Sequence, residues 1–226
     1  MSQAISQRRE KTFRAVRPRV LLADDHRMLR EVFSQILAAD CDVVGAVGDG
    51  RAVLSAASEL NPDVVVLDIG MPLLNGLDAA RQLKRTMPEV KIVVLTVNED
   101  ADLAADAIRA GASCYLLKNS AASELLQAID EAMRGRSYIT PLVAKGLVDA
   151  LARGPGESAE PALASPRQRE VLQLVAEGRT MKEVARILKI TPRTVAFHKY
   201  GLMKQLGVRS TAELVMAAIK LGVISS

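Results

Sequence analysis

Carboxylates, a hydroxyl group and an ammonium group follow short apolar runs of this sequence. Asp68 comes directly after the run 64–67, and the pair Asp24-Asp25 comes after the run 20–23. Two later runs end in Thr96 and Lys118. Short apolar runs that are rich in β-branched residues are typical of buried strands. Because parallel strands end at one edge of a sheet, we expect these polar side chains to converge there.

Such a group of side chains has a definite chemistry. Neighbouring carboxylates raise one another's pKa unless a cation lies among them, and hard oxygen ligands suit Mg²⁺. With the metal, Lys118 would neutralise the oxygens of a phosphoryl group, and Thr96 could hydrogen-bond one of them. Asp68 is the candidate nucleophile, since carboxylates form aspartyl phosphates. Taken alone, Asp68 could equally cap the loop that follows its strand.

The elements that must position these residues alternate between strands and helices. Strand-like runs begin near residues 19, 41, 64, 91 and 113, and helical patterns follow them at 28–37, 50–60, 77–87, 100–110 and 121–134. This alternation over about 115 residues predicts an α/β domain with a doubly wound, five-stranded parallel sheet and helices on both faces.

The last part of the chain reads as a smaller all-α domain of four helices. Ser165-Pro166 and Thr191-Pro192 each place an N-cap residue before a proline at the first helical position. The tight turn at 188–191 joins the second and third helices and is typical of a helix-turn-helix. On the third helix, Phe197 and Tyr200 share a face with basic residues, and we expect that face to meet solvent or DNA.

Charge is distributed unevenly along the 226 residues, although the net charge is only +4. The first 19 residues carry about +5 and the segment from Pro166 onward about +7, so the part between them carries about −8. An acidic body joined to a basic domain predicts that the basic domain binds a polyanion.

No apolar run approaches the roughly 18–20 residues of a membrane span, and no secretory signal is evident, so we expect a cytoplasmic protein without membrane contact. The two cysteines have no metal-binding or CxxC spacing.

The strand-end residues resemble the receiver domain of bacterial two-component response regulators. Asp24-Asp25, Asp68 followed by Met71-Pro72 and Gly76, Thr96, and Tyr115 three residues before Lys118 match that family in order and spacing. The resemblance implies a CheY-like, flavodoxin-like fold. It also implies that Asp68 accepts a phosphoryl group from the phosphohistidine of a sensor histidine kinase.

The same resemblance assigns the other roles. Asp25, Asp68 and the backbone carbonyl of Gly70 would bind Mg²⁺, with Asp24 helping through a water molecule. Lys118 would contact the phosphoryl oxygen, and Thr96 and Tyr115 would form the conformational switch. His26 is expected only as a helix-start residue.

Three positions depart from the family pattern. Val97 is bulkier than the residue usual there, and Asn119 stands where proline is common. Gly70 has no side chain to shield a phosphoryl group from water. None of these removes a required group, but they leave the lifetime of the acyl phosphate open.

The basic domain resembles the LuxR-type helix-turn-helix through residues 165–172, Gly178, residues 182–185 and Thr194-Val195 with His198. With the receiver, the chain is similar to the NarL/FixJ subfamily of response regulators. The resemblance implies that the third helix enters the major groove. Tyr200 and Ala196 stand where the family often has lysine, so the preferred DNA sequence should differ, and Phe197 could touch a thymine methyl group. The expected DNA contacts are Lys182, Thr191, Arg193, Thr194, Ala196, Phe197, Lys199, Tyr200 and Lys204.

We therefore predict a disordered basic extension at 1–18, a receiver at 19–139, a helical stretch and flexible linker at 140–163, and a DNA-binding domain at 164–226. The expected function is transcription regulation controlled by phosphorylation. The expected partners are double-stranded DNA, a sensor histidine kinase, RNA polymerase as a further candidate, and a second copy of the chain when phosphorylated. The only expected reactions are self-phosphorylation and slow self-dephosphorylation at Asp68, so we do not expect an enzyme.

In the unphosphorylated form we expect the receiver to cover the third helix of the basic domain, and Tyr115 to turn inward on phosphorylation. Two alternatives stay open. One is a Mg²⁺-dependent phosphatase with the same nucleophile, although the carboxylates lie on separate strands without a DxD motif. The other is a constitutive DNA-binding protein with a vestigial receiver.

Overall fold

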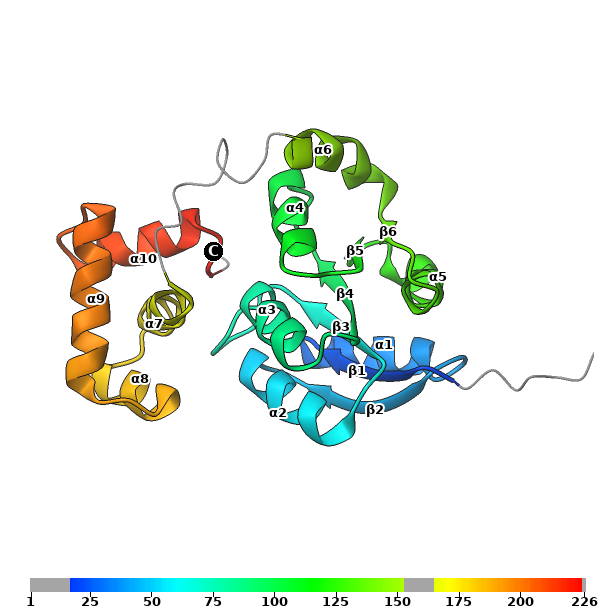
Figure 1. Ribbon diagram of the computed structural model, residues 1–226, viewed down its shortest axis with the longest axis horizontal. Helices are drawn as coiled ribbons and strands as arrows, with labels where there is room; N and C mark the ends of the chain where they lie inside the picture. The colour runs from blue at the N-terminus through cyan, green and yellow to red at the C-terminus, as the bar shows by residue number, and fades with distance from the viewer. Residues whose placement is uncertain (1–16, 153–164, 225–226) are drawn as a thin grey trace, which may run out of the picture.

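The computed structural model describes residues 17–152 and 165–224, which form an N-terminal and a C-terminal domain (Figure 1). Within the predicted helical stretch and linker at 140–163, residues 153–163 lie outside the described residues, as does nearly all of the predicted extension at 1–18. The described residues of the N-terminal domain contain a six-stranded parallel sheet in the order β2-β1-β3-β4-β5-β6. Its strands are β1 (Arg19–Ala23), β2 (Asp42–Val47), β3 (Val64–Asp68), β4 (Lys91–Thr96), β5 (Cys114–Leu117) and β6 (Tyr138–Ile139).

Helices cover both faces of this sheet, as the sequence predicts. They are α1 (Arg27–Leu37), α2 (Gly50–Leu60), α3 (Gly76–Thr86), α4 (Ala101–Arg109), α5 (Ala121–Met133) and α6 (Pro141–Ala152). On β3, Val65 and Leu67 join a core with α2, α3, α4 and α6, whereas Val64 and Val66 join a core with α1 and α5. Because both faces of β3 are buried, its apolar run has no polar alternation.

The prediction of five strands was wrong by one. β6 pairs in parallel with β5 through Tyr138 and Ile139, in the short segment between the helix predicted to end near Arg134 and the helix predicted to start at Thr140-Pro141. Two residues are too short a run for hydrophobic periodicity to reveal. The helix expected from Thr140-Pro141 to about Ala152 is present as α6, and its residues Val143, Leu147 and Ala150 pack into the core of the N-terminal domain.

The C-terminal domain has the four predicted helices: α7 (Pro166–Ala176), α8 (Met181–Leu188), α9 (Pro192–Leu206) and α10 (Thr211–Lys220). Ser165 and Thr180 form capping boxes at the starts of α7 and α8, and Thr191 caps α9. Gly207 ends α9 in the left-handed conformation, at φ 66°. Apolar residues of all four helices form a separate core, which we call the C-terminal core.

The two domains meet through α7, which hydrogen-bonds to the segment 71–75 just before α3. Helix α9 lies on the side of the C-terminal domain that faces away from the sheet (Figure 1). Within the described ranges, no helix is both long and apolar enough to cross a membrane.

Candidate functional site

The ends of β1, β3 and β5 bring Asp24, Asp68 and Lys118 together, as the sequence predicts. Lys118 Nζ lies 2.7 Å from Asp24 Oδ2 and 2.9 Å from Asp68 Oδ2. All three side chains are buried. One ammonium group therefore neutralises two carboxylates that are shielded from solvent.

The electrostatics of this group follow from its burial. Loss of hydration raises the pKa of Asp68 above its ordinary value, and the charge and hydrogen bond of Lys118 only partly oppose this. Burial lowers the pKa of Lys118, but its hydrogen bonds and charge interactions with Asp24 and Asp68 outweigh that effect and raise it overall. Lys118 is therefore held in its charged form. Asp68 is a carboxylate that is poorly hydrated and close to a cation.

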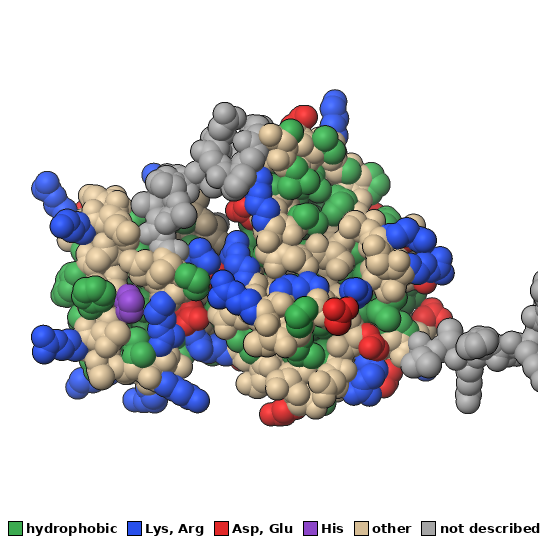
Figure 2. Space-filling view, viewed as in Figure 1, with side chains coloured by type: hydrophobic (Ala, Val, Ile, Leu, Met, Phe, Trp, Pro, Cys, Tyr) green, Lys and Arg blue, Asp and Glu red, His purple; other side chains and the backbone are tan. Residues whose placement is uncertain are grey.

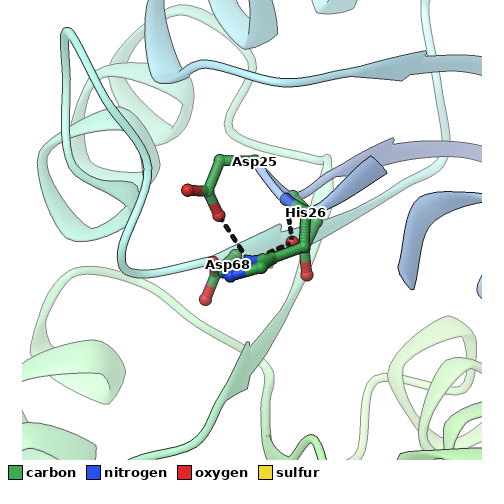
Figure 3. A group of neighbouring side chains, drawn as sticks. Asp25, His26 and Asp68 are labelled. Carbon is green, nitrogen blue, oxygen red and sulfur yellow. Dashed lines mark hydrogen bonds and ion pairs between the residues drawn. The ribbon is translucent and has the colours of Figure 1, made fainter. Parts of the chain in front are cut away.

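Asp25 and His26 lie next to Asp68 (Figure 3), and because both are exposed they extend the cluster toward solvent. Oxygens of Asp24, Asp25 and Asp68 and a ring nitrogen of His26 all lie within 4.8 Å of one another. His26 Nδ1 is 2.8 Å from Asp25 Oδ1, and the His26 backbone N–H donates to Asp24 Oδ1 at 2.8 Å. His26 begins α1, as expected, but its ring also contacts the acidic pair, which the sequence interpretation missed. The contact could have been predicted from the sequence, because His26 directly follows Asp24-Asp25.

The loop after Asp68 contains Gly70, whose backbone hydrogen-bonds to the Asp68 carboxyl group. Together with Asp25, Gly70 lines a cavity of about 320 Å³. The loop returns at Gly76, whose N–H donates to the carbonyl of Ile69 at 2.9 Å. A Cβ atom at Gly76 would stand 2.0 Å from the backbone oxygen of Asp68, so only glycine fits this approach. This close approach explains why the motif has a glycine at position 76.

The two predicted switch residues lie side by side on β4 and β5. Thr96 is buried, and its Oγ1 accepts a hydrogen bond from the N–H of Asn98 at 3.1 Å. The Tyr115 ring is fully buried, and its hydroxyl donates to the Asn98 carbonyl at 2.9 Å. The expectation that Tyr115 turns inward on phosphorylation does not fit this structure, in which the Tyr115 side chain is already buried. Val97 is 80% exposed and points to solvent.

The predicted DNA contacts gather on α8 and α9. Phe197 is 75% exposed and Tyr200 60% exposed, and Phe197 packs edge-on against His198 with ring centroids 5.6 Å apart. Lys199 is half-buried, and its Nζ donates to Thr211 Oγ1 at 2.8 Å, so this lysine bridges to α10. Of the other predicted contacts, the exposed ones are Lys182, Thr191, Arg193 and Lys204, and the half-buried ones are Thr194 and Ala196.

Lysine and arginine side chains surround the C-terminal domain on the face shown in Figure 2. Neither Phe197 nor Tyr200 is covered by the N-terminal domain, because α7, not α9, makes the contact between domains. The expectation that the receiver covers the third helix of this domain is therefore wrong for this structure. The basic face is open to a polyanion in the arrangement described.

Comparisons with known proteins agree with this geometry. Residues 20–130 match the response regulator receiver domain, and residues 163–218 match the bacterial regulatory proteins of the luxR family. The chain is 38% identical over 203 residues to the transcriptional regulatory protein LiaR of Bacillus subtilis, covering 88% of this chain and 96% of LiaR. It is 33% identical over 210 residues to the oxygen regulatory protein NreC of Staphylococcus carnosus, covering 89% and 97%.

Solved structures show the same fold. The RcsB response regulator of Salmonella typhimurium matches with a TM-score of 0.55 and 27% identity, covering 89% of this chain and 97% of that one. A structure of the two-component response regulator RcsB in complex with DNA matches with a TM-score of 0.56 and 26% identity, covering 88% and 96%. The chain thus belongs to the two-component response regulators of the NarL/FixJ subfamily, which join a receiver domain to a LuxR-type DNA-binding domain.

Proposed function

We propose that this response regulator is phosphorylated on Asp68 by a sensor histidine kinase, and that the phosphoryl group controls its dimerisation and its binding to DNA. The observation that carries the proposal is the contact of Lys118 Nζ with Asp68 Oδ2, at 2.9 Å in a buried site. A buried carboxylate beside a fixed ammonium group is suited to hold a phosphoryl group whose oxygens need neutralisation.

The donor set also fits Mg²⁺. Asp24, Asp25 and Asp68 bring hard carboxylate oxygens close together, and the carbonyl of Gly70 belongs to the loop beside them. Asp25 and Asp68 would hold the ion with Gly70, and Asp24 would hold it through water. The ion would supply positive charge to neutralise the phosphoryl oxygens.

The chain's own residues account for the transfer itself. An Asp68 carboxylate oxygen attacks phosphorus, and the bond from phosphorus to the donor's imidazole nitrogen breaks. Lys118, which contacts both Asp24 and Asp68 in this structure, pairs with the negative oxygens of the phosphoryl group, and Thr96 donates a hydrogen bond to one of them from its hydroxyl. We propose no turnover of an external substrate, only this self-phosphorylation and slow loss of the phosphoryl group to water.

The test is a comparison of the wild type with Asp68→Asn. With acetyl phosphate and Mg²⁺, intact mass should show one added phosphoryl group on the wild type and none on the variant or in excess chelator. DNA that has been selected from random sequences for binding to the phosphorylated chain (selected DNA) should bind more tightly to the phosphorylated than to the unphosphorylated chain, and light scattering should show a dimer. Phosphorylation at another residue would contradict the proposal. So would equal DNA affinity, together with equal molar mass by light scattering, in the two forms.

A second candidate function is DNA binding that needs no phosphorylation. The exposure of Phe197 and Tyr200 on α9 favours it, because the recognition surface is open before any phosphoryl group is added. The same experiment separates the two candidates. Equal affinity of wild type and Asp68→Asn for selected DNA, with or without acetyl phosphate, would favour the constitutive function.

A further inference from the structure

Arg30 of α1 reaches back to the end of β1. Its guanidinium group donates a hydrogen bond from Nη1 to the backbone carbonyl of Asp24. The backbone N–H of Arg30 donates to the carbonyl of His26 at 3.1 Å, so the arginine stands one turn after the residue at which the helix begins. A hydrogen bond from a charged donor is stronger than one between neutral groups, and this one is partly buried. The start of α1 is therefore fastened to the end of β1.

The carbonyl that Arg30 binds belongs to the peptide group between Asp24 and Asp25. A peptide group is planar, so the direction of this carbonyl also fixes the position of the N–H and the Cα atom of Asp25. On the other side of Asp24, its N–H donates to the carbonyl of Val47 in β2 at 3.2 Å. The sheet thus holds the backbone before the Asp24 side chain, and Arg30 holds the backbone after it. A rotation of this peptide group would turn the Asp25 carboxylate.

The two carboxylates of the acidic pair differ in how firmly their side chains are held. Asp24 is fixed at both oxygens, by Lys118 Nζ at 2.7 Å and by the N–H of His26 at 2.8 Å. Asp25 instead contacts the ring of His26, whose side chain is 65% exposed. An exposed contact adds little rigidity, so the direction of the Asp25 carboxylate depends on its backbone. That backbone is the part of the chain that Arg30 holds.

Gly48, directly after β2, leaves room for the guanidinium group. A Cβ atom at Gly48 would stand 2.9 Å from Arg30 Nη1, closer than such atoms can approach. Gly48 does not have a positive φ, so its backbone conformation does not require glycine. The space that Arg30 occupies is therefore the constraint on this position. A larger residue would displace the guanidinium group, because an arginine side chain moves more easily than the backbone of a strand.

We propose that Arg30 is a positioning residue for the divalent ion of the phosphorylation site, and that Gly48 provides the space that Arg30 needs. By holding the peptide group between Asp24 and Asp25, Arg30 keeps the Asp25 carboxylate close to Asp68. Mg²⁺ requires nearly ideal octahedral geometry, so a misdirected carboxylate oxygen costs affinity. The inference rests on the proposed function, because it takes binding of Mg²⁺ at Asp25 and Asp68 as given.

Isothermal titration calorimetry of the full chain with magnesium chloride measures this role directly. Arg30→Gln should weaken Mg²⁺ binding by about tenfold, the loss typical of removing a group that orients a metal ligand. Arg30→Lys keeps a cationic donor without the guanidinium fork, so it should recover part of the affinity and bind about threefold more weakly than the wild type. Arg27→Gln, at an exposed arginine of the same helix, is the matched control and should stay within about twofold. Wild-type affinity in Arg30→Gln would overturn the proposal.

Gly48→Ala disturbs the same contact without changing Arg30. It should weaken Mg²⁺ binding by about fivefold in the wild-type background. In the Arg30→Gln background it should have no further effect, because both changes act through one guanidinium group. Losses that add in the double variant would contradict the shared mechanism, as would wild-type affinity in Gly48→Ala alone.

The kinetics of phosphorylation by acetyl phosphate separate positioning from general loss of structure. In Arg30→Gln, the Mg²⁺ concentration that gives half the maximal rate should rise by about tenfold, while the rate at saturating Mg²⁺ stays within about twofold of the wild type. A lower rate at saturating Mg²⁺ with an unchanged half-maximal concentration would indicate structural damage and overturn the role of Arg30. Absence of Mg²⁺ binding and phosphorylation in the wild type would instead overturn the proposed function.

Discussion

Lys118 and Asp68 form a buried ion pair, 2.9 Å from Nζ to Oδ2, at the ends of two strands that are not neighbours in the sheet. The same ammonium group also contacts Asp24 at 2.7 Å. Removing it would leave two buried carboxylates without a cation, so Lys118 carries part of the stability of this sheet edge as well as its chemistry.

Lys118→Met should lower the free energy of unfolding of the N-terminal domain by about 3 kcal/mol near pH 7, because it leaves the carboxylates of Asp24 and Asp68 buried without a cation. Urea unfolding followed by circular dichroism measures this change. Lys145→Met, at an exposed lysine on α6, is the control and should stay within about 0.5 kcal/mol of the wild type. A loss below about 1 kcal/mol for Lys118→Met would show that the site relaxes around the carboxylates.

Asp68→Asn should unfold at a higher temperature than the wild type near neutral pH and without divalent metal. Burial raises the pKa of Asp68 in the folded state, so the ionised Asp68 carboxylate lowers the free energy of unfolding. This loss of stability is fully present at pH values above the folded-state pKa, and it disappears as the pH falls below the unfolded-state pKa. The advantage of Asp68→Asn should therefore shrink as the pH is lowered toward the ordinary range of aspartate. Thermal melts at a series of pH values test this, and an advantage that grows on acidification would contradict it.

Much of this site could be predicted from the sequence because strand ends are local signals. Asp24, Asp68 and Lys118 each follow an apolar run, and a parallel sheet brings such positions to one edge whatever the details of packing. The two-residue β6 gives no such signal. Its partner Cys114–Tyr115 lies more than twenty residues away along the chain, and pairing at that distance is decided by tertiary packing.

The position of α7 could not be predicted either. Gln173 lies on a helix whose sequence shows only a capping signal and an apolar face, and its partners are backbone groups of the other domain. A single glutamine has no periodicity, and leucine is not a residue type from which a positive φ at position 73 would be predicted. The uncovered α9 follows from this contact, so the expectation of a covered recognition helix failed for the same reason.

Gly76→Ala should destabilise the N-terminal domain by about 3 kcal/mol and prevent phosphorylation by acetyl phosphate. The new Cβ would stand 2.0 Å from the backbone oxygen of Asp68, and the obstacle is backbone that has no rotamer to change. Urea unfolding and intact mass measure the two effects. Wild-type stability together with normal phosphorylation would mean that the start of α3 can shift away from β3.

Gly201→Ala should have the opposite effect and raise the stability of the C-terminal domain by about 1 kcal/mol. Gly201 lies within α9, where alanine is the better helix former. Its Cβ would meet only Gln168 Nε2, at 3.9 Å, which is an ordinary contact. Because the two domains can unfold separately, the relevant measurement is the helical transition of the C-terminal domain, followed by circular dichroism in urea. A loss of stability would indicate that α9 needs flexibility at this position.

Phe197→Ala should weaken binding to selected DNA by about tenfold and relax the preference for thymine at one position. Phe197 is exposed on α9, and an aromatic ring in the major groove can contact the thymine methyl group. Replacing that thymine by uracil removes only the methyl group, so it should weaken the wild type and leave Phe197→Ala unaffected. Lys204→Ala is the contrasting variant: it should weaken binding to all sequences alike and reduce the salt dependence by about one counterion. Equal sensitivity of wild type and Phe197→Ala to uracil would show that Phe197 does not read that base, whatever its effect on affinity.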